Sequence, residues 1–328
     1  MTISKALLFA AAFVFAALMP AFAQETRSFT AANGTFDIPV APLRIVALND
    51  QIVALPLYEL GANVVGSAGR TDANGGHFLR GGMDTLGIDY ANTDIAYIGG
   101  FNALDVEAIA ALQPDLIIGG PYTDAAVAEQ LQKVAPTLII DNNELGIIET
   151  MRTLADITGQ TGNFEARLER YQDNVTRTRG FIESPQDISV TMTFVFPEGA
   201  EMWVYKHAGN LGAIAQVVRD LGFKETSAVA ALADNETNFS AELIQDLDAD
   251  FIFGFYRQQP DATPASVNAA YETFAPGWCQ ALTACQNGQF ILLPGPTFGP
   301  TMTGLEMALE LIESNIAARP FTPFVEVN

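Results

Sequence analysis

The chain has 328 residues, of which 49% are hydrophobic, and it carries 16 Lys and Arg against 38 Asp and Glu. This length allows two domains of ordinary size with large buried cores. The formal net charge of −22 argues against nucleic acid and anionic membranes as partners, because both repel an acidic surface.

The first residues have the pattern of an export signal. Met1–Ala23 carries a single charge, Lys5, followed by an apolar run that ends in the small-x-small pattern read by signal peptidase. A transmembrane anchor is the alternative, but the run is shorter than the roughly 20 apolar residues that a span needs. No Cys follows the cleavage site, so a lipid-anchored form is not expected. We therefore expect a soluble exported protein that starts near Gln24.

Short apolar runs alternate with helical patterns through the first half of the chain. Strand, helix and strand in this order predict a parallel sheet with helices on its faces. We expect a hairpin at 35–39, strands at 44–48, 64–66 and 137–140, a loop rich in Gly, Asn and Asp at 67–84, and helices at 52–60, 125–134 and 149–158.

One stretch of the first half, Leu104–Gly119, reads as a short helix that runs into a buried strand. Asp105 is suited to cap this helix, because its short side chain can accept backbone N–H groups of the first turn. Glu107 then lies in the first turn, where the helix dipole favours negative charge. Pro114 is expected to end the helix before the strand begins.

The same unit returns at Phe239–Gly254, with Ser240 in the place of Asp105 as the expected cap. Some shared positions follow from the apolar pattern of any helix–strand unit, but a Glu, an Asp and a Gly held in place are more specific. The matched pairs are Glu107 and Glu242, Ile109 and Ile244, Leu112 and Leu247, Asp115 and Asp250, Ile117 and Ile252, and Gly119 and Gly254. We infer two lobes built on one plan.

A longer helical pattern at 163–182 separates the two copies. Asn163 is expected to cap it and Ser184-Pro185 to end it. Its apolar face is formed by Leu168, Tyr171, Val175, Thr178 and Phe181. The prediction is an α/β fold of two Rossmann-like lobes, 24–161 and 184–328, whose parallel-rich sheets are joined by a single long helix at 162–183. A helix packed wholly on one lobe is the alternative.

The second half repeats the alternation of strands and helices. We expect strands at 189–196, 202–205 and 289–293, helices at 210–221 and 304–318, and helix with loop at 261–275. Cys279 and Cys285 follow one another closely, and an exported protein meets an oxidising compartment, so we predict a disulfide. Two free buried thiols are the alternative. Without a nearby His, the two cysteines make a poor zinc site.

Several motifs in this order resemble the iron-siderophore and vitamin B12 periplasmic binding proteins that serve ABC importers. They are Arg44-Ile45-Val46, the Glu-x-Ile-x-x-Leu-x-Pro-Asp-Leu-Ile-Ile run from Glu107, the helix from Gly209 to Gly222 and the segment Trp278–Leu282. The resemblance implies a class III fold of two α/β lobes bridged by one rigid helix, with the ligand in the cleft between them. Tyr256-Arg257 and the run Trp278–Ala284 look closest to the ferric-citrate and hydroxamate branch.

The resemblance also implies a function. It predicts a periplasmic carrier that captures a ferric siderophore of citrate or hydroxamate type and delivers it to an inner-membrane ABC permease. The iron would arrive already chelated, so neither an intrinsic cofactor nor a protein metal site is expected. Family members dock onto permease arginines through one Glu per lobe, which corresponds here to Glu107 and Glu242. The alternative is that both are ordinary first-turn residues. We expect a monomer.

Ligands of parallel sheets bind beyond the carboxyl ends of the strands, and this rule selects candidate contacts. Arg suits a chelate that presents anionic oxygens, because its planar fork holds them in pairs, while Tyr and Trp offer flat apolar surface with one donor. The candidates are Asn49, Arg70, Tyr122, Trp203, Tyr205 and Arg257. Each has a structural alternative: Arg70 as a solvated loop residue and Trp203 as a core residue.

A haem or cobalamin carrier of the same fold is the alternative function. Tyr122, Tyr205 or His207 would then be the candidate ligands of haem iron. Phe101 and Phe298 stand where the citrate branch tends to have Arg, which predicts a more apolar cleft. The sequence contains no GxSxG, P-loop or HExxH motif, so an enzyme is not expected.

Overall fold

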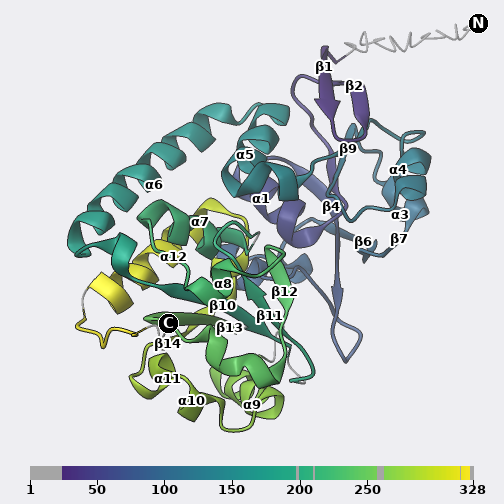
Figure 1. Cartoon of the computed structure of the whole chain (residues 1–328). Helices are drawn as coiled ribbons and strands as arrows, with labels where there is room; N and C mark the ends of the chain where they lie inside the picture. Colours follow the sequence, from purple (N-terminus) through teal and green to yellow (C-terminus); the bar gives the residue numbers. More distant parts are fainter. Residues whose placement is uncertain (1–23, 197–198, 210, 257–261, 318, 326–328) are drawn as a thin grey trace, which may run out of the picture.

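The computed structural model describes residues 24–325 except 197–198, 210, 257–261 and 318. The predicted signal peptide at 1–23 and the candidate Arg257 lie outside the described residues. Two sheets with their covering helices form two halves of the molecule, and α6 (Thr161–Phe181) runs along both of them (Figure 1). No helix of the described residues is long and apolar enough to cross a bilayer.

The N-terminal half contains a sheet of seven strands in the order β7-β6-β4-β3-β8-β9, with β5 paired to β4. β4 pairs in parallel with β3 and β6, and β8 pairs in parallel with β3 and β9, as the alternating pattern predicted. Its strands are β3 (Ile45–Ala47), β4 (Val64–Thr71), β5 (His77–Phe78), β6 (Ala96–Gly100), β7 (Ala103–Leu104), β8 (Leu116–Gly119) and β9 (Thr137–Ile139). The loop expected from Ser67 is wrong in part, because β4 continues to Thr71; β6 and β7 were not foreseen.

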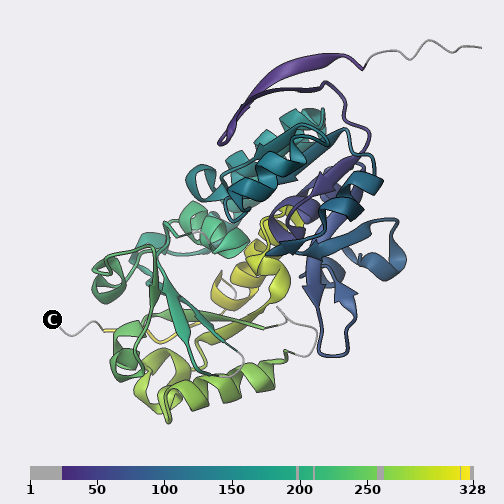
Figure 2. The ribbon, with the colours of Figure 1, turned by 90° about the vertical axis from the view of Figure 1, so that its right-hand side faces the viewer.

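The helices of this half follow the strands in order. They are η1 (Asp50–Ala54), α1 (Leu55–Glu59), α2 (Gly82–Leu86), η2 (Tyr90–Asn92), α3 (Val106–Ala111), α4 (Ala125–Leu131) and α5 (Asn142–Ile157). A hairpin, β1 (Thr26–Ala31) with β2 (Gly34–Pro39), precedes the sheet and confirms the hairpin expected at 35–39. Figure 2 shows this hairpin lying over α5, beside the sheet.

The C-terminal half contains a sheet of five strands in the order β12-β11-β10-β13-β14. β10 and β13 pair in parallel, as do β13 and β14, whereas β11 runs antiparallel to β10 and β12. Its strands are β10 (Val190–Val195), β11 (Met202–Tyr205), β12 (Glu236–Asn238), β13 (Phe251–Tyr256) and β14 (Phe290–Pro294). Its helices are η3 (Pro185–Asp187), α7 (Gly212–Leu221), α8 (Ser227–Ala230), η4 (Ala241–Leu247), α9 (Pro264–Phe274), α10 (Trp278–Ala281), α11 (Thr283–Gln286), η5 (Gly295–Phe298), α12 (Met302–Ile312) and η6 (Glu313–Ala317). A disulfide joins Cys279 and Cys285, as predicted.

The long helix α6 contacts α5 of the N-terminal half and both α7 and α12 of the C-terminal half. The helix α6 is therefore packed against both halves of the molecule. Two details of the expectation are wrong. Asn163 is not the cap: the N-cap position is Gln160, to which the Asn163 side chain donates. Phe181 is 55% exposed, because it lies at the last turn, beyond the packed face.

The apolar core is continuous between the two halves. A single cluster of buried side chains includes Ile45 and Leu116 from the first sheet, Val190 and Phe253 from the second, and Tyr171 of α6 between them. In Figure 2, α12, drawn in yellow, lies between the two sheets. The halves are thus packed against each other through helices.

The repeated unit occupies equivalent places in the two sheets. α3 leads into β8, which pairs with β3, and η4 leads into β13, which pairs with β10. The matched glycines are both closely packed: a Cβ would lie 2.6 Å from Thr123 Oγ1 at Gly119 and 2.9 Å from Leu292 Cδ2 at Gly254, so these side chains would have to shift. Asp105 caps α3 as predicted, but the Ser240 side chain makes no capping hydrogen bond, and the second copy is a 3₁₀-helix.

Candidate functional site

The carboxyl ends of the parallel strands of the N-terminal sheet meet at one edge, where α/β proteins bind their ligands. Asn49 follows β3, Arg70 lies near the end of β4, Phe101 follows β6 and Tyr122 follows β8. α2, close behind Arg80 in the chain, contacts η5 and α12 of the C-terminal half. This edge of the N-terminal sheet therefore faces the other half of the molecule.

Asp50 is the buried centre of this edge, with a side chain only 1% exposed. Its Oδ2 accepts the backbone N–H of Arg80 at 2.9 Å. The guanidinium groups stand further away: Arg80 Nη2 is 3.7 Å from Oδ1, and Arg70 Nε is 4.0 Å from Oδ2. These two distances are ion-pair contacts rather than hydrogen bonds. We call Asp50, Arg70, Arg80 and Phe101 the arginine site.

The arginine site contains polar atoms without partners. Asp50 Oδ1 and Arg80 Nε are both buried and have no hydrogen-bond partner among the described residues. Burial lowers the pKa of Arg80; the carboxylate of Asp50 opposes this effect and the charge of Arg70 adds to it. Buried polar atoms are normally paired in folded proteins, so these two atoms are open to a bound water or a ligand.

Aromatic rings lie at the same edge of the sheet as Arg70. The Cζ of Arg70 lies 4.0 Å from the centroid of the Phe101 ring, a cation–π contact that fixes the guanidinium plane. Nearby, His77 stacks on Tyr97 with ring centroids 3.7 Å apart, and Tyr90 meets Tyr97 edge-on. Phe101 was expected to make the cleft more apolar; in the structure it supports a charge.

The facing part of the C-terminal half is aromatic. Phe298, in η5 after β14, lies 5.7 Å from Phe255 and 6.0 Å from Phe194, measured between ring centroids. Phe194 also meets Phe196, which is 39% exposed. Trp203 pairs with Phe194 across β10 and β11 and is only partly buried. The described residues of the C-terminal half thus present aromatic side chains, whereas the N-terminal half presents the charged side chains of the arginine site.

The predicted contacts differ in how accessible they are. Tyr122 is 66% exposed, and Asn143 donates to its hydroxyl at 3.4 Å. Asn49 is 7% exposed, and its Oδ1 caps η1 by accepting the backbone N–H of Ile52. Tyr205 is 8% exposed. The strand-end rule does not apply to Tyr205, because β11 is antiparallel to β10. Tyr205 nevertheless lies close enough to Tyr122 for that residue to contribute to its raised pKa, whose main cause is burial.

His207 is a buried structural residue. Its ring is 8% exposed, and Nε2 donates to the carbonyl oxygen of Val190 at 2.8 Å. Burial is the largest effect on its pKa, which is lowered despite the Val190 carbonyl and the nearby Glu225. A ring held in this way is not available to haem iron. Among the described residues, no group of His, Cys, Asp and Glu side chains is placed to hold a metal ion.

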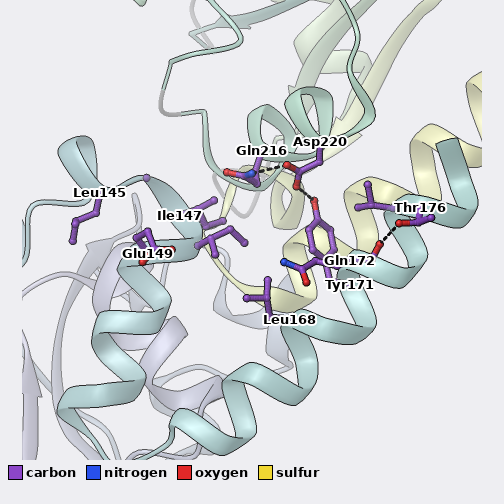
Figure 3. Close-up of a pocket in the computed structure, with 12 residues that line it drawn as sticks. Leu145, Ile147, Glu149, Leu168, Tyr171, Gln172, Thr176, Gln216 and Asp220 are labelled. Atoms are coloured by element: carbon purple, nitrogen blue, oxygen red, sulfur yellow. Dashed lines mark hydrogen bonds between the residues drawn. The ribbon is translucent and has the colours of Figure 1, made fainter. Parts of the chain in front are cut away.

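A hollow of about 490 Å³ lies elsewhere, between α5, α6 and α7 (Figure 3). Its main polar groups are already paired, since Asp220 accepts from Tyr171 at 2.7 Å and from Gln216 at 2.9 Å. The Thr176 hydroxyl donates to the backbone of its own helix. Volume alone would favour this hollow as a binding site, but two of the buried polar atoms without a partner among the described residues, and both charged ones, belong to the arginine site.

These features define a class: a two-lobed α/β binding protein with one long helix between the lobes and a ligand edge on each sheet. The chain belongs to the periplasmic binding protein family, whose model matches residues 82–297. It is a substrate-binding protein and not an enzyme.

Relatives confirm the resemblance read from the sequence. The chain is 27% identical to the iron(3+)-hydroxamate-binding protein FhuD of Bacillus subtilis over 70% of this chain and 69% of that protein. It is 26% identical to the ferric enterobactin-binding periplasmic protein FepB of Escherichia coli over 83% and 85%. Staphylococcus aureus SirA, in complex with staphyloferrin B, shares the fold with a TM-score of 0.68 at 23% identity, over 88% and 97% of the two chains.

Proposed function

We propose that the protein captures a ferric siderophore of citrate or hydroxamate type between its two halves and delivers it to the permease of an ABC importer. The relatives named above bind a hydroxamate, enterobactin and staphyloferrin B, so the family alone leaves the chelate open. We further propose that residues 1–23 are a signal peptide cleaved on export to the periplasm, and that the lobes span 24–161 and 184–328, with the linking helix at 162–183.

The arginine site is the observation that supports this proposal. Arg70 and Arg80 keep their side chains 23% and 25% exposed at an edge that faces the other half. Neither guanidinium donates a hydrogen bond to another described residue. Guanidinium groups of this kind suit the oxygen-rich surface of an iron chelate, while the rings of Phe196, Trp203 and Tyr122 provide flat surface for its organic part.

Titration of the purified mature protein tests the proposal. Ferric citrate, ferrichrome, haemin and cobalamin are added in turn while intrinsic fluorescence is followed, since both Trp203 and Tyr122 would lie near the ligand. We expect saturable binding of a ferric siderophore. A Soret shift with haemin and no response to either iron chelate would instead favour the haem carrier, with the exposed Tyr122 as ligand.

Glu107 and Glu242 are proposed to dock onto the permease. Both are exposed, and each lies in the first turn of its helix, in α3 and in η4. One carboxylate on each half matches a partner made of two similar subunits that present arginines. The alternative, that they only stabilise helix dipoles, predicts no effect on transport.

The E107A/E242A variant tests docking. Because both residues lie outside the arginine site, chelate affinity should stay within about twofold of the parent, while uptake by cells carrying the permease should fall at least about tenfold. E129A, which removes an exposed Glu from α4, is the matched control and should transport normally. Lost chelate binding, or normal uptake, would contradict the docking role.

A further inference from the structure

Asp50 is unusual among the carboxylates of the molecule because it serves two arginines without closing a hydrogen bond to either guanidinium. A carboxylate whose task is to neutralise an Arg normally accepts two parallel N–H bonds at about 2.7–2.9 Å. Here the two ion-pair distances are 3.7 Å and 4.0 Å. The carboxylate is instead anchored by the backbone N–H of Arg80.

Asp50, Arg70 and Arg80 together carry a net charge of about +1, because Arg keeps its proton at any physiological pH. Asp50 is 1% exposed, whereas the two Arg side chains are 23% and 25% exposed. A ligand can therefore approach the two Arg side chains, although Arg80 Nε is itself buried, but not the carboxylate.

The geometry points to Asp50 as the residue that sets the charge of the arginine site, and to an iron chelate with carboxylate groups on its surface as the ligand. This inference rests on the proposed function and adds the chemical class of the chelate. The unused guanidinium donors would hold carboxylate oxygens in pairs. A neutral trihydroxamate chelate would gain only polar contacts, and a highly charged anion would find part of the attraction cancelled by Asp50.

Three variants and two probes test the inference. The probes are ferric citrate, which is anionic, and ferrichrome, which is neutral. D50N raises the charge of the site by one, R70Q lowers it by one, and D50N/R70Q restores it. D173N, at an exposed position of α6, changes the net charge of the protein as D50N does but away from the site.

We expect the wild-type protein to prefer ferric citrate. D50N should tighten ferric citrate by about tenfold with a steeper dependence on salt, and R70Q should weaken it by about tenfold. The double variant should return to within about threefold of wild type. Affinity for ferrichrome should change less than about threefold throughout, and D173N should behave as wild type.

Equal changes for both probes, or weaker ferric citrate binding by D50N, would overturn the inference, as would a double variant weaker than R70Q. Circular dichroism melting shows whether each variant folds. If D50N alone does not fold, the comparison of D50N/R70Q with R70Q carries the test, because the second substitution must restore affinity for ferric citrate. Wild-type protein that binds neither probe nor any other ferric siderophore would end the proposed function itself; binding without charge dependence ends only this inference.

Discussion

Asp115 and Asp250 occupy the same place in the two copies of the repeated unit and perform the same task. Asp115 accepts the backbone N–H groups of Leu43 and Arg44, just before β3, at 2.7 and 2.9 Å. Asp250 accepts the backbone N–H and hydroxyl of Ser189, just before β10, at 2.7 and 2.8 Å. Each carboxylate thus joins the start of its own strand to the start of the neighbouring parallel strand, which explains why an Asp recurs there.

The two positions differ in burial, and this predicts different costs of substitution. Asp250 is 5% exposed and also accepts the backbone N–H of Phe324 at 2.7 Å, whereas Asp115 is half-buried. D250A should lower the free energy of unfolding by about 3 kcal/mol or more, because its donors stay buried and unpaired, and D115A by about 1 kcal/mol. Urea unfolding measures both, each variant serving as the control for the other. Equal losses would show that burial does not decide the cost.

The site was only partly predictable at the level of residues. The strand-end rule places Arg70 and Tyr122 at the carboxyl edge of the N-terminal sheet, as the structure does, because it depends only on the parallel order of strands. Asp50 and Arg80 were not selected. Their contact joins residues distant in sequence, and no spacing indicates it. The available signal was an acidic residue directly after a buried strand, next to the chosen Asn49, which turned out to be the helix cap.

At the scale of elements, the strands with long apolar runs were predictable and the short or Gly-rich strands were not. β8 stands out because it is buried and apolar throughout, and β10 because it is an almost fully buried run of apolar and Thr residues. β6 reads Ala-Tyr-Ile-Gly-Gly, and the second part of β4 has small residues followed by Arg70 and Thr71, so neither resembles a strand in isolation. These two strands form because neighbouring strands provide hydrogen-bonding partners for their backbone groups. Strands at sheet edges and irregular strands depend on such tertiary contacts more than on their own sequence.

The N-terminal hairpin illustrates how such an edge is protected. β9 is the last strand of its sheet, and an exposed edge invites pairing with other chains. Asn33, at the turn between β1 and β2, donates to the Thr137 carbonyl and accepts the Ile139 N–H, both at 2.9 Å. The backbone N–H of Ala32 adds a third bond, to the Ile139 carbonyl. The tip of the hairpin therefore covers the edge of β9.

N33A is expected to uncover this edge. The variant should lose about 1–2 kcal/mol of stability, because the backbone N–H of Ile139 loses its partner and the Thr137 carbonyl keeps only the Gln132 side chain as a donor. It should also aggregate faster on mild heating, because the edge becomes free to pair with other chains. Urea unfolding and light scattering measure the two effects. T35A, which removes an exposed hydroxyl on the same hairpin, is the control and should change neither. Scattering equal to that of the control would mean that the hairpin does not guard the sheet.

At the scale of the whole molecule, the two halves share more than the linking helix. The apolar cluster is continuous through both sheets and α6. Glu59 of α1 adds a polar junction: it is 3% exposed, accepts the backbone N–H groups of Met302 and Thr303 at 2.8 Å each, and pairs with Arg167 of α6 at 2.9 Å. A residue of the N-terminal half thus caps the first turn of α12. The sequence predicted two halves and a helix between them but not this junction, because a cap supplied from so distant a residue leaves no local pattern.

Glu59 should therefore limit how far the halves move apart. E59Q keeps the shape of the side chain but removes the charge that holds Arg167 and the start of α12, so we expect a loss of about 2–3 kcal/mol and faster hydrogen exchange at Met302 and Thr303. Small-angle scattering should show a larger difference between the ligand-free and chelate-bound protein than in the wild type, because the halves gain freedom when the ligand is absent. E306Q is the matched control: Glu306 also pairs with Arg167, at 3.2 Å, but it belongs to α12 and does not reach the N-terminal half. If E306Q opened the molecule as much as E59Q, the two halves would be held together by the pairing of Arg167 in general and not by the contact of Glu59 with α12.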